Sequence, residues 1–480
     1  MIHKNEIGEV SSRASLKKEV YLFVFFLIAF LFFAYYNDWE YDESTSYNGV
    51  LTSGLWELLT YNKFKTANNH LLNSLYFKLL QNWHITNVVY YRLLSVSGFV
   101  LFFIANSKLL KLLRINYAYI IILTVTPFFF YFTLGRGYAL AIGCFAMSFF
   151  YLMKYVHKQE VRYEYLVVIF GAISSLAIFS FLYGFLSLFI VLCFFKRRHL
   201  MDVHTLLLST IVLALLIYIY ILGKIINYSD PSIIGVKNFN LFSYGTVSSI
   251  LSDFSYRDQL IHLFFDESKF VLFVKYFKIV ITLCIIIPMV YGSKIRSGKI
   301  DMSNSKTILV VLISLPFLIM ISANIFTHAL YPLKRAVFYL HYLVLLLILI
   351  STVTFSKKPV FYIPVIVIFL TSFFYSAYIY YDLSRPTIKE ILAKTDKYPL
   401  YVLLKNNPNI TLINNLYGID KKDIIQDSVL NEVVPKIQSD TSKIRYLLSW
   451  PEYKDSTLNV FRNNKVYNCR GGNVLIEIFR

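Results

Sequence analysis

Charged residues are scarce in this sequence. Asp, Glu, Lys and Arg together make up 16% of its 480 residues, which gives too little polar surface to cover the core of a soluble protein of this length. Instead, the chain is 57% hydrophobic and has a mean hydropathy of +0.57. It contains many windows of about 20 apolar residues, each long enough to cross a bilayer core. The composition therefore excludes a soluble globular protein and predicts a mostly α, polytopic helical membrane protein.

Cysteine is also rare, and its placement excludes two of its common uses. Three of the four cysteines lie inside apolar runs, one lies in the polar tail, and no two have CxxC spacing: Cys144, Cys193, Cys284 and Cys469. The sequence predicts neither a zinc site nor a disulfide framework. Glycine-rich phosphate loops and nucleophile elbows are absent as well, so chemistry on soluble nucleotides is not expected.

About eleven apolar runs are predicted to cross the membrane. They are residues 20–36, 88–106, 117–134, 138–154, 164–180, 183–195, 205–222, 270–291, 307–325, 336–354 and 359–379. The first run follows a polar stretch of mixed charge and lacks a small-residue cleavage pattern, which predicts an uncleaved span rather than a signal peptide.

The basic residues indicate an orientation. The net charge is +19, and Lys and Arg collect before the first run and in every second link between runs, as the positive-inside rule expects. With an odd number of spans, this predicts a cytoplasmic N-terminus and a C-terminal tail on the far side. The positive charge suits an anionic membrane surface. No basic groove with interleaved aromatic residues is visible, so nucleic acid is not an expected partner.

The chain is predicted to divide into a transmembrane domain, residues 1–380, and a small extracytoplasmic α/β domain, residues 381–480. The second region alternates polar connections with β-rich stretches, at 398–404, 409–415 and 473–479. About 100 residues suffice for a modest core.

The first loop, residues 37–87, is predicted to contain a helix that lies in the membrane interface. Within residues 68–83, six apolar residues share one helical stripe: Leu71, Leu72, Leu75, Tyr76, Leu79 and Leu80. About twelve residues are too few to span a bilayer but suit an interfacial helix. Asn69 is the expected N-cap, with His70 in the opening turn.

Two adjacent acids, Asp42 and Glu43, follow the first span. A carboxylate at this position can act as a general base on an acceptor hydroxyl, or hold a divalent cation through its oxygens. The simpler interpretation is a solvated, charged start of a loop. No cofactor is specified by the sequence, and a cation is compatible with it but not required.

Other candidate residues lie on the same predicted face. Arg136 occupies the tight turn "LGRG", and Lys334 and Arg335 lie at the mouth of a late span. Cationic side chains at these positions suit either a phosphate or lipid headgroups. His70 and Tyr138 suit contacts to a substrate, although a helix-end contact and an interface aromatic are the simpler interpretations.

The order of these motifs resembles the GT-C superfamily of membrane glycosyltransferases. The matching segments are "DWEYDESTSY", "ANNHLLNSLYFKLL", "YRLLSVSGFVLFF", "GRGYALAIGCFAMSFFYLMKY" and "YPLKRAVFYLHYLVLLLIL". The likeness is greatest to the bacterial branch related to protein O-mannosyltransferases and the lipid A aminoarabinose transferase, which are glycosyltransferase families 39 and 83. It covers most of the first 380 residues. Many relatives have His-Pro-Pro where this chain has "NNHLLN", which keeps His70 but lacks the proline pair.

The resemblance implies an enzyme of the bacterial plasma membrane that transfers a sugar from a polyprenyl-phosphate donor, with inversion, to a glycan, lipid or protein acceptor. It implies Asp42 as the base with Glu43 in support. Arg335, Arg136 and Lys334 would bind the donor phosphate, and His70 and Tyr138 would lie on the acceptor side. A transporter or flippase of lipid-linked saccharides, a polymerase of such saccharides and a non-catalytic scaffold remain alternatives.

Overall fold

The computed structural model describes residues 3–36, 41–65, 69–124, 128–196, 202–229, 302–332 and 334–355, together with five strands between residues 400 and 479. The predicted spans 270–291 and 359–379 lie outside the described residues.

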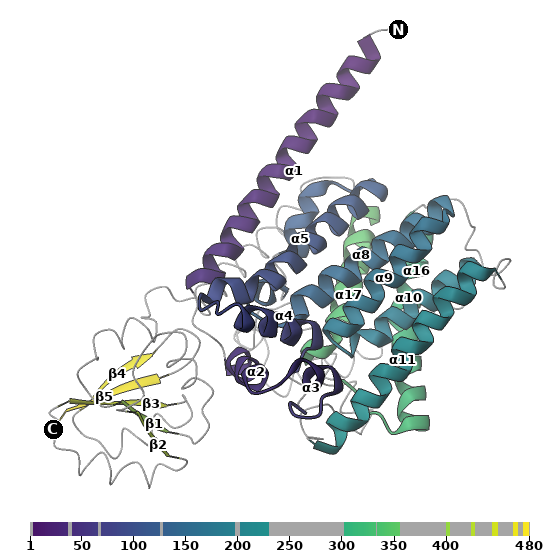
Figure 1. Cartoon of the computed structure of the whole chain (residues 1–480). Helices are drawn as coiled ribbons and strands as arrows, with labels where there is room; N and C mark the ends of the chain where they lie inside the picture. Colours follow the sequence, from purple (N-terminus) through teal and green to yellow (C-terminus); the bar gives the residue numbers. More distant parts are fainter. Residues whose placement is uncertain are drawn as a thin grey trace, which may run out of the picture.

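The described helices form one bundle followed by a sheet (Figure 1). The helices of the N-terminal half are α1 (His3–Tyr36), α2 (Tyr41–Leu51), α3 (Leu55–Thr60), α4 (Leu71–Asn82), α5 (Val88–Leu112), η1 (Tyr117–Tyr119), α6 (Ile120–Thr124), α7 (Phe128–Tyr131), α8 (Gly137–Lys158), α9 (Val161–Ala177), α10 (Phe181–Phe195) and α11 (Val203–Ser229). They are followed by α16 (Met302–Thr327), η4 (Lys334–Val337) and α17 (Phe338–Phe355).

Five helices within the described residues are long and apolar enough to cross a membrane. These segments are Lys17–Tyr36, Val88–Leu112, Gly137–Lys158, Val203–Ile226 and Ser305–Thr327, and two shorter apolar helices are Phe181–Phe195 and Phe338–Ser351. The predicted class, a polytopic helical membrane protein, is confirmed. The predicted span 117–134 differs, because its described residues form the three short pieces η1, α6 and α7. Its sequence contains Pro127, which has no backbone N–H to donate.

Helices α5 and α8 approach closely because small residues face each other. A Cβ on Gly143 would lie 2.2 Å from the carbonyl oxygen of Gly98, and a Cβ on Gly98 would lie 2.4 Å from the backbone of Ala139. Ala139 and Gly143 stand four residues apart on α8, the small-xxx-small spacing that lets helix backbones meet in membranes. This contact brings the start of α5 against the turn that precedes α8.

Buried polar bonds also tie the helices together. The hydroxyl of Tyr342 on α17 donates to Asn106 Oδ1 on α5 at 2.8 Å. Lys196, at the end of α10, pairs with Glu164 on α9, and both side chains are almost completely buried. Each group is satisfied by its partner, as burial in apolar surroundings requires.

Helix α4 is the helix predicted within residues 68–83, and it packs on the protein. Its buried face contains Leu71, Asn73, Ser74, Phe77 and Leu80, whereas Leu79 of the predicted stripe is 43% exposed. The N-cap is His70 and not Asn69. The reason is that the side chain of Asn69 donates instead to the carbonyl of Phe64, at 3.2 Å.

The C-terminal strands form one mixed sheet in the order β2-β1-β3-β5-β4. They are β1 (Leu400–Leu403), β2 (Ile424–Asp427), β3 (Ile444–Ser449), β4 (Asn464–Asn468) and β5 (Val474–Phe479). β1 is parallel to β2 and β3, and β5 is antiparallel to β3 and β4. Parallel pairs need long crossover connections, which fits an α/β organisation. The predicted stretches 398–404 and 473–479 contain β1 and β5, and 409–415 lies outside the described residues.

Candidate active site

The two acids after the first span lie in the first turn of α2. Acidic residues are stabilised at a helix N-terminus by the partial positive charge of its free N–H groups. The side chain of Glu43 is completely buried. The backbone of Asp42 is helical, and its side chain lies outside the described residues.

Glu43 forms a bidentate ion pair with Arg92, near the start of α5. Arg92 Nε donates to Glu43 Oε1 at 3.0 Å, and its Nη2 donates to Oε2 at 2.8 Å. Both side chains are at most 1% exposed. The remaining Arg92 nitrogen, Nη1, donates to the carbonyl of Ala34 at 2.9 Å, which satisfies an end carbonyl of α1. One guanidinium therefore connects α1, α2 and α5.

The same carboxylate also holds the turn before α8. The backbone N–H of Gly135 donates to Glu43 Oε1, and the Gly135 carbonyl accepts from Asn73 Nδ2 of α4 at 2.8 Å. A Cβ at position 135 would lie 3.0 Å from both Glu43 Oε1 and Phe77 Cζ, so a larger residue there would force these side chains to shift. We call the connected group Glu43, Arg92, Asn73 and Gly135 the buried ionic hub.

Arg136 follows the hub directly and is the N-cap of α8. Its side chain is 1% exposed, and its guanidinium carbon lies 5.3 Å from the ring centroid of Tyr138. Its carbonyl accepts from Ser95 Oγ of α5 at 3.0 Å. The structure therefore places this predicted cation inside the protein, against an aromatic ring, within one residue of the turn held by Glu43.

His70 and Tyr138, both proposed from the sequence, lie together. Their ring centroids are 5.0 Å apart and the rings meet edge to face. Tyr138 also contacts Tyr131, at 5.0 Å, and Phe338 at the start of α17, at 5.9 Å. Tyr138 therefore contacts three aromatic rings, those of His70, Tyr131 and Phe338, in addition to the Arg136 guanidinium.

The loop before α4 is fixed by a buried phenol. The hydroxyl of Tyr61 donates to the carbonyl of Asn69, next to His70. Complete burial raises the pKa of Tyr61 well above its ordinary value, with a smaller contribution from Tyr218. Tyr61 therefore remains a neutral hydrogen-bond donor at any physiological pH, and this contact does not change with pH.

Lys334 and Arg335 occupy η4, and their side chains lie outside the described residues. The backbone of η4 is anchored, because Ser180 Oγ at the N-cap of α10 donates to the Ala336 carbonyl at 2.6 Å. The next helix begins with Phe338, whose ring lies 4.8 Å from Tyr131. Arg335 is therefore only three residues before Phe338, which belongs to the aromatic cluster around Tyr138.

The structure adds residues that the sequence analysis missed. Arg92, Asn73 and Gly135 were not proposed, although one signal was available. Arg92 is a charged residue at the start of an otherwise apolar span, and charged residues inside spans commonly have a buried partner. The partner itself cannot be read from the sequence, because Glu43 is 49 positions away.

Among the residues that the structure describes, no three His, Cys, Asp or Glu side chains gather in a way that could hold a metal ion. Both oxygens of Glu43 are already engaged by Arg92 and Gly135. If a cation binds at the acidic pair, Asp42 is therefore the residue to supply the oxygen ligands.

Comparison with solved structures finds a similarity in fold. The fold is similar to the crystal structure of ArnT from Cupriavidus metallidurans in the apo state, with a TM-score of 0.40 and 11% sequence identity, over 97% of this chain and 98% of that chain. No family model matches the chain. No curated protein matches it either.

Proposed function

We propose that this protein is a membrane glycosyltransferase that moves a sugar from a polyprenyl-phosphate donor to an acceptor hydroxyl outside the cytoplasm, with inversion at the anomeric carbon. The observation that carries the proposal is the buried ionic hub. It fixes α2, whose first turn contains Asp42, to the turn that contains Arg136. A carboxylate and a guanidinium are the two groups that this transfer requires.

Asp42 is the proposed base and Glu43 its support. Because Glu43 is buried and bound by Arg92 and by the Gly135 N–H, it supports the reaction by positioning α2 rather than by accepting a proton. Asp42 takes the proton of the acceptor hydroxyl as the oxygen attacks the anomeric carbon. The bond from that carbon to the phosphate oxygen breaks, and the polyprenyl phosphate leaves with the electron pair.

Arg136, Arg335 and Lys334 are the proposed donor-phosphate residues. Preorganised cations stabilise the charge that develops on a leaving phosphate, and a phosphate needs no general acid to depart. The contact between Arg136 and Tyr138 and the Ser180 bond to η4 support this assignment, since both hold cation-bearing segments near one aromatic cluster. His70 and Tyr138 are the proposed acceptor-side residues.

The proposed setting is the bacterial plasma membrane, with a cytoplasmic N-terminus and an extracytoplasmic C-terminal α/β domain. The acceptor is a glycan, a lipid or a protein. A flippase, transporter or polymerase of lipid-linked saccharides is the competing proposal. Transporters place charged groups near the bilayer midplane, beside broken helices. Here Glu43 and Arg92 lie at the ends of α2 and α5, which favours the enzyme.

Release of the leaving group tests the function directly. Purified protein is incubated with a panel of polyprenyl-phosphate sugars and a bacterial envelope extract as the source of acceptor. We expect free polyprenyl phosphate to appear with at least one donor, measured by chromatography, and to require the extract. Movement of an intact donor across vesicles without any release would instead support the flippase.

Arg335 offers a test of the phosphate site. In Arg335→Ala we expect donor affinity to fall by about ten- to a hundredfold, because charge-assisted hydrogen bonds are each worth roughly 1.5–3 kcal/mol. Arg335→Lys should recover only part of the affinity, since lysine lacks the planar fork that binds a phosphate bidentately. Donor binding is measured by calorimetry or by displacement of a labelled donor. Full recovery with lysine would mean that Arg335 only anchors the helix in the headgroups.

A further inference from the structure

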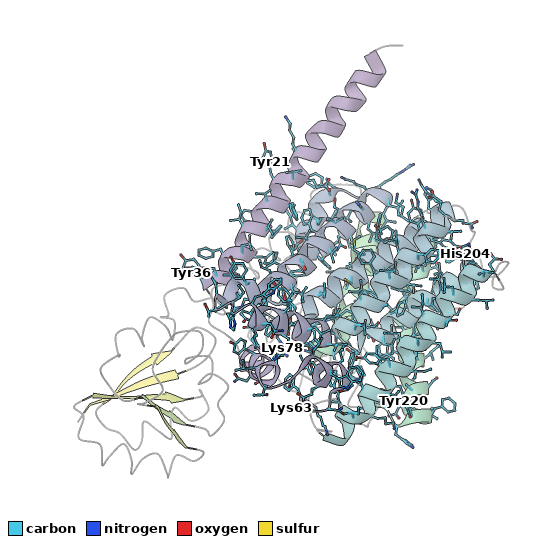
Figure 2. All side chains as sticks on the ribbon, viewed as in Figure 1. Tyr21, Tyr36, Lys63, Lys78, His204 and Tyr220 are labelled. Carbon is cyan, nitrogen blue, oxygen red and sulfur yellow. The ribbon has the colours of Figure 1, made fainter. Side chains whose placement is uncertain are left out.

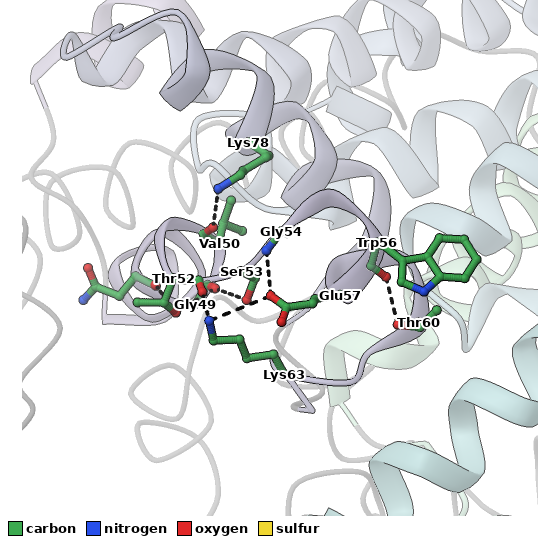
Figure 3. A network of polar contacts seen from close by, with 11 residues as sticks. Gly49, Val50, Thr52, Ser53, Gly54, Trp56, Glu57, Thr60, Lys63 and Lys78 are labelled. Carbon is green, nitrogen blue, oxygen red and sulfur yellow. Dashed lines mark hydrogen bonds and ion pairs between the residues drawn. The ribbon is translucent and has the colours of Figure 1, made fainter.

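The short helix α3 begins with two exposed apolar residues, Leu55 and Trp56, which we call the apolar tip. Leu55 is 58% exposed and Trp56 is 72% exposed, whereas Leu58 in the same helix is completely buried. The indole of Trp56 points away from the polar contacts of Glu57 and Lys63 (Figure 3). A large aromatic residue this exposed, next to an exposed leucine, suits an apolar partner.

The contacts between α3 and α11 indicate how deep the apolar tip lies relative to the membrane span of α11. The hydroxyl of Tyr218 on α11 donates to the carbonyl of Leu59 on α3 at 2.8 Å. Tyr61, just after α3, packs in the cluster that contains Leu222 and Ile226 of α11. The candidate span of α11 ends at Ile226, so at 1.5 Å per residue Tyr218 lies about 12 Å before its end, within one leaflet of about 15 Å. Helix α3 therefore lies beside the last turns of a span rather than beyond it.

A lysine near the end of the α11 span is consistent with a membrane interface at this level. Lys224 on α11 donates to the carbonyl of Thr327 at 3.0 Å, and its ammonium lies 5.6 Å from the ring of Tyr220. Lysines near span ends extend their charged groups toward the interface in this way. Figure 2 shows Tyr220, Lys63 and Lys78 toward one end of the helical bundle and His204 toward the other.

The lipid-facing surface of α11 leads to α3. Exposed apolar side chains continue along α11 to this end of the span, among them Ile217 and Ile221, at 53% and 51% exposure. Leu55 and Trp56 are exposed on α3, which contacts α11 at this end of the span. Its backbone also suits this depth, because α3 is helical and the Glu57 carboxylate accepts the N–H of Gly54 at 2.7 Å.

We propose that Leu55 and Trp56 insert into the leaflet at this end of the bundle and contact the glycerol and upper acyl-chain region of phospholipids. Tryptophan prefers this zone, because its ring is apolar while its N–H needs a polar partner. Only Thr52–Gly54 separate α2 from α3, so the insertion also fixes the depth of α2 and its acidic pair. The proposal does not depend on the proposed enzymatic function.

Fluorescence quenching in lipid nanodiscs tests the insertion. In one full-length variant, Trp39, Trp83 and Trp450 are changed to Phe, which leaves Trp56 as the reporter. A positive control lacks all four native tryptophans and carries Tyr220→Trp, at a 50% exposed position on the lipid-facing side of α11. Both are placed in phosphatidylcholine nanodiscs whose acyl chains carry bromine either near the headgroup or near the chain end.

We expect bromine near the headgroup to quench most of the Trp56 emission, as in the control, and bromine at the chain end to quench much less. Aqueous iodide should have little effect. Strong quenching by iodide without quenching by bromolipid would overturn the proposal, because the indole would then lie in water. Resistance to both quenchers would also overturn it, because protein, such as a second copy of the chain, would then cover the tip.

Discussion

Arg92→Met is expected to destabilise the folded protein by about 3–5 kcal/mol, the usual result when one partner of a buried ion pair is removed. The change removes both charge-assisted hydrogen bonds to the Glu43 carboxylate, which stays buried next to the Gly135 N–H. It also removes the donor to the Ala34 carbonyl. The measurement is the thermal unfolding midpoint of purified protein in detergent, together with the yield of monodisperse protein.

A matched control comes from a second arginine. Arg162 pairs with Glu160 at 2.5 Å, but its side chain is 66% exposed. Arg162→Met should leave the unfolding midpoint almost unchanged, because water screens exposed ion pairs. Equal effects of the two substitutions would contradict a special role for the hub.

A double substitution separates stability from activity. Glu43→Leu with Arg92→Met replaces the pair by apolar side chains, which is often neutral for stability. We expect the unfolding midpoint to recover most of its loss while turnover stays low, because Asp42 and Arg136 are no longer fixed to each other. If turnover returns together with stability, the hub has only a structural role.

Asp42→Asn is expected to lower turnover by roughly the 10²–10⁴-fold that loss of a general base costs. The amide keeps the shape of the carboxylate but cannot accept the acceptor's proton. Donor affinity and the unfolding midpoint should change little, since the hub is formed by Glu43 and not by Asp42. Release of polyprenyl phosphate gives the turnover, and donor titration gives the affinity.

Two further variants make this assignment specific. Glu160→Gln removes a partly exposed acid that contacts Lys158 and Arg162, and it should leave turnover unchanged. Glu43→Gln should lower turnover together with stability, because it leaves Arg92 buried beside a neutral amide. Near-normal turnover in a folded Asp42→Asn protein would remove Asp42 from the mechanism, and a loss of turnover in Glu43→Gln at wild-type stability would make Glu43 the base.

Several features of this protein follow from the sequence alone. The length of an apolar run is a local property, so the predicted spans 20–36, 88–106 and 138–154 agree to within about six residues with the candidate spans Lys17–Tyr36, Val88–Leu112 and Gly137–Lys158. The strands β1 and β5 could also be predicted, because a β-rich composition is likewise a local property of the sequence. The candidate residues Asp42, Glu43 and Arg136 were selected because they lie at the ends of apolar runs, where a charged side chain must reach water, headgroups or a partner.

Only the tertiary structure decided how these residues meet. Glu43 is 49 positions from Arg92 and 92 positions from Gly135, and the three come together because Gly98 and Gly143 let α5 and α8 approach. The sequence predicted an interfacial stripe on α4, but packing turned Asn73, Ser74 and Phe77 of that helix toward the protein. Amphipathic spacing shows that a helix has two faces, whereas which face is covered, and by what, depends on contacts between segments far apart in the chain.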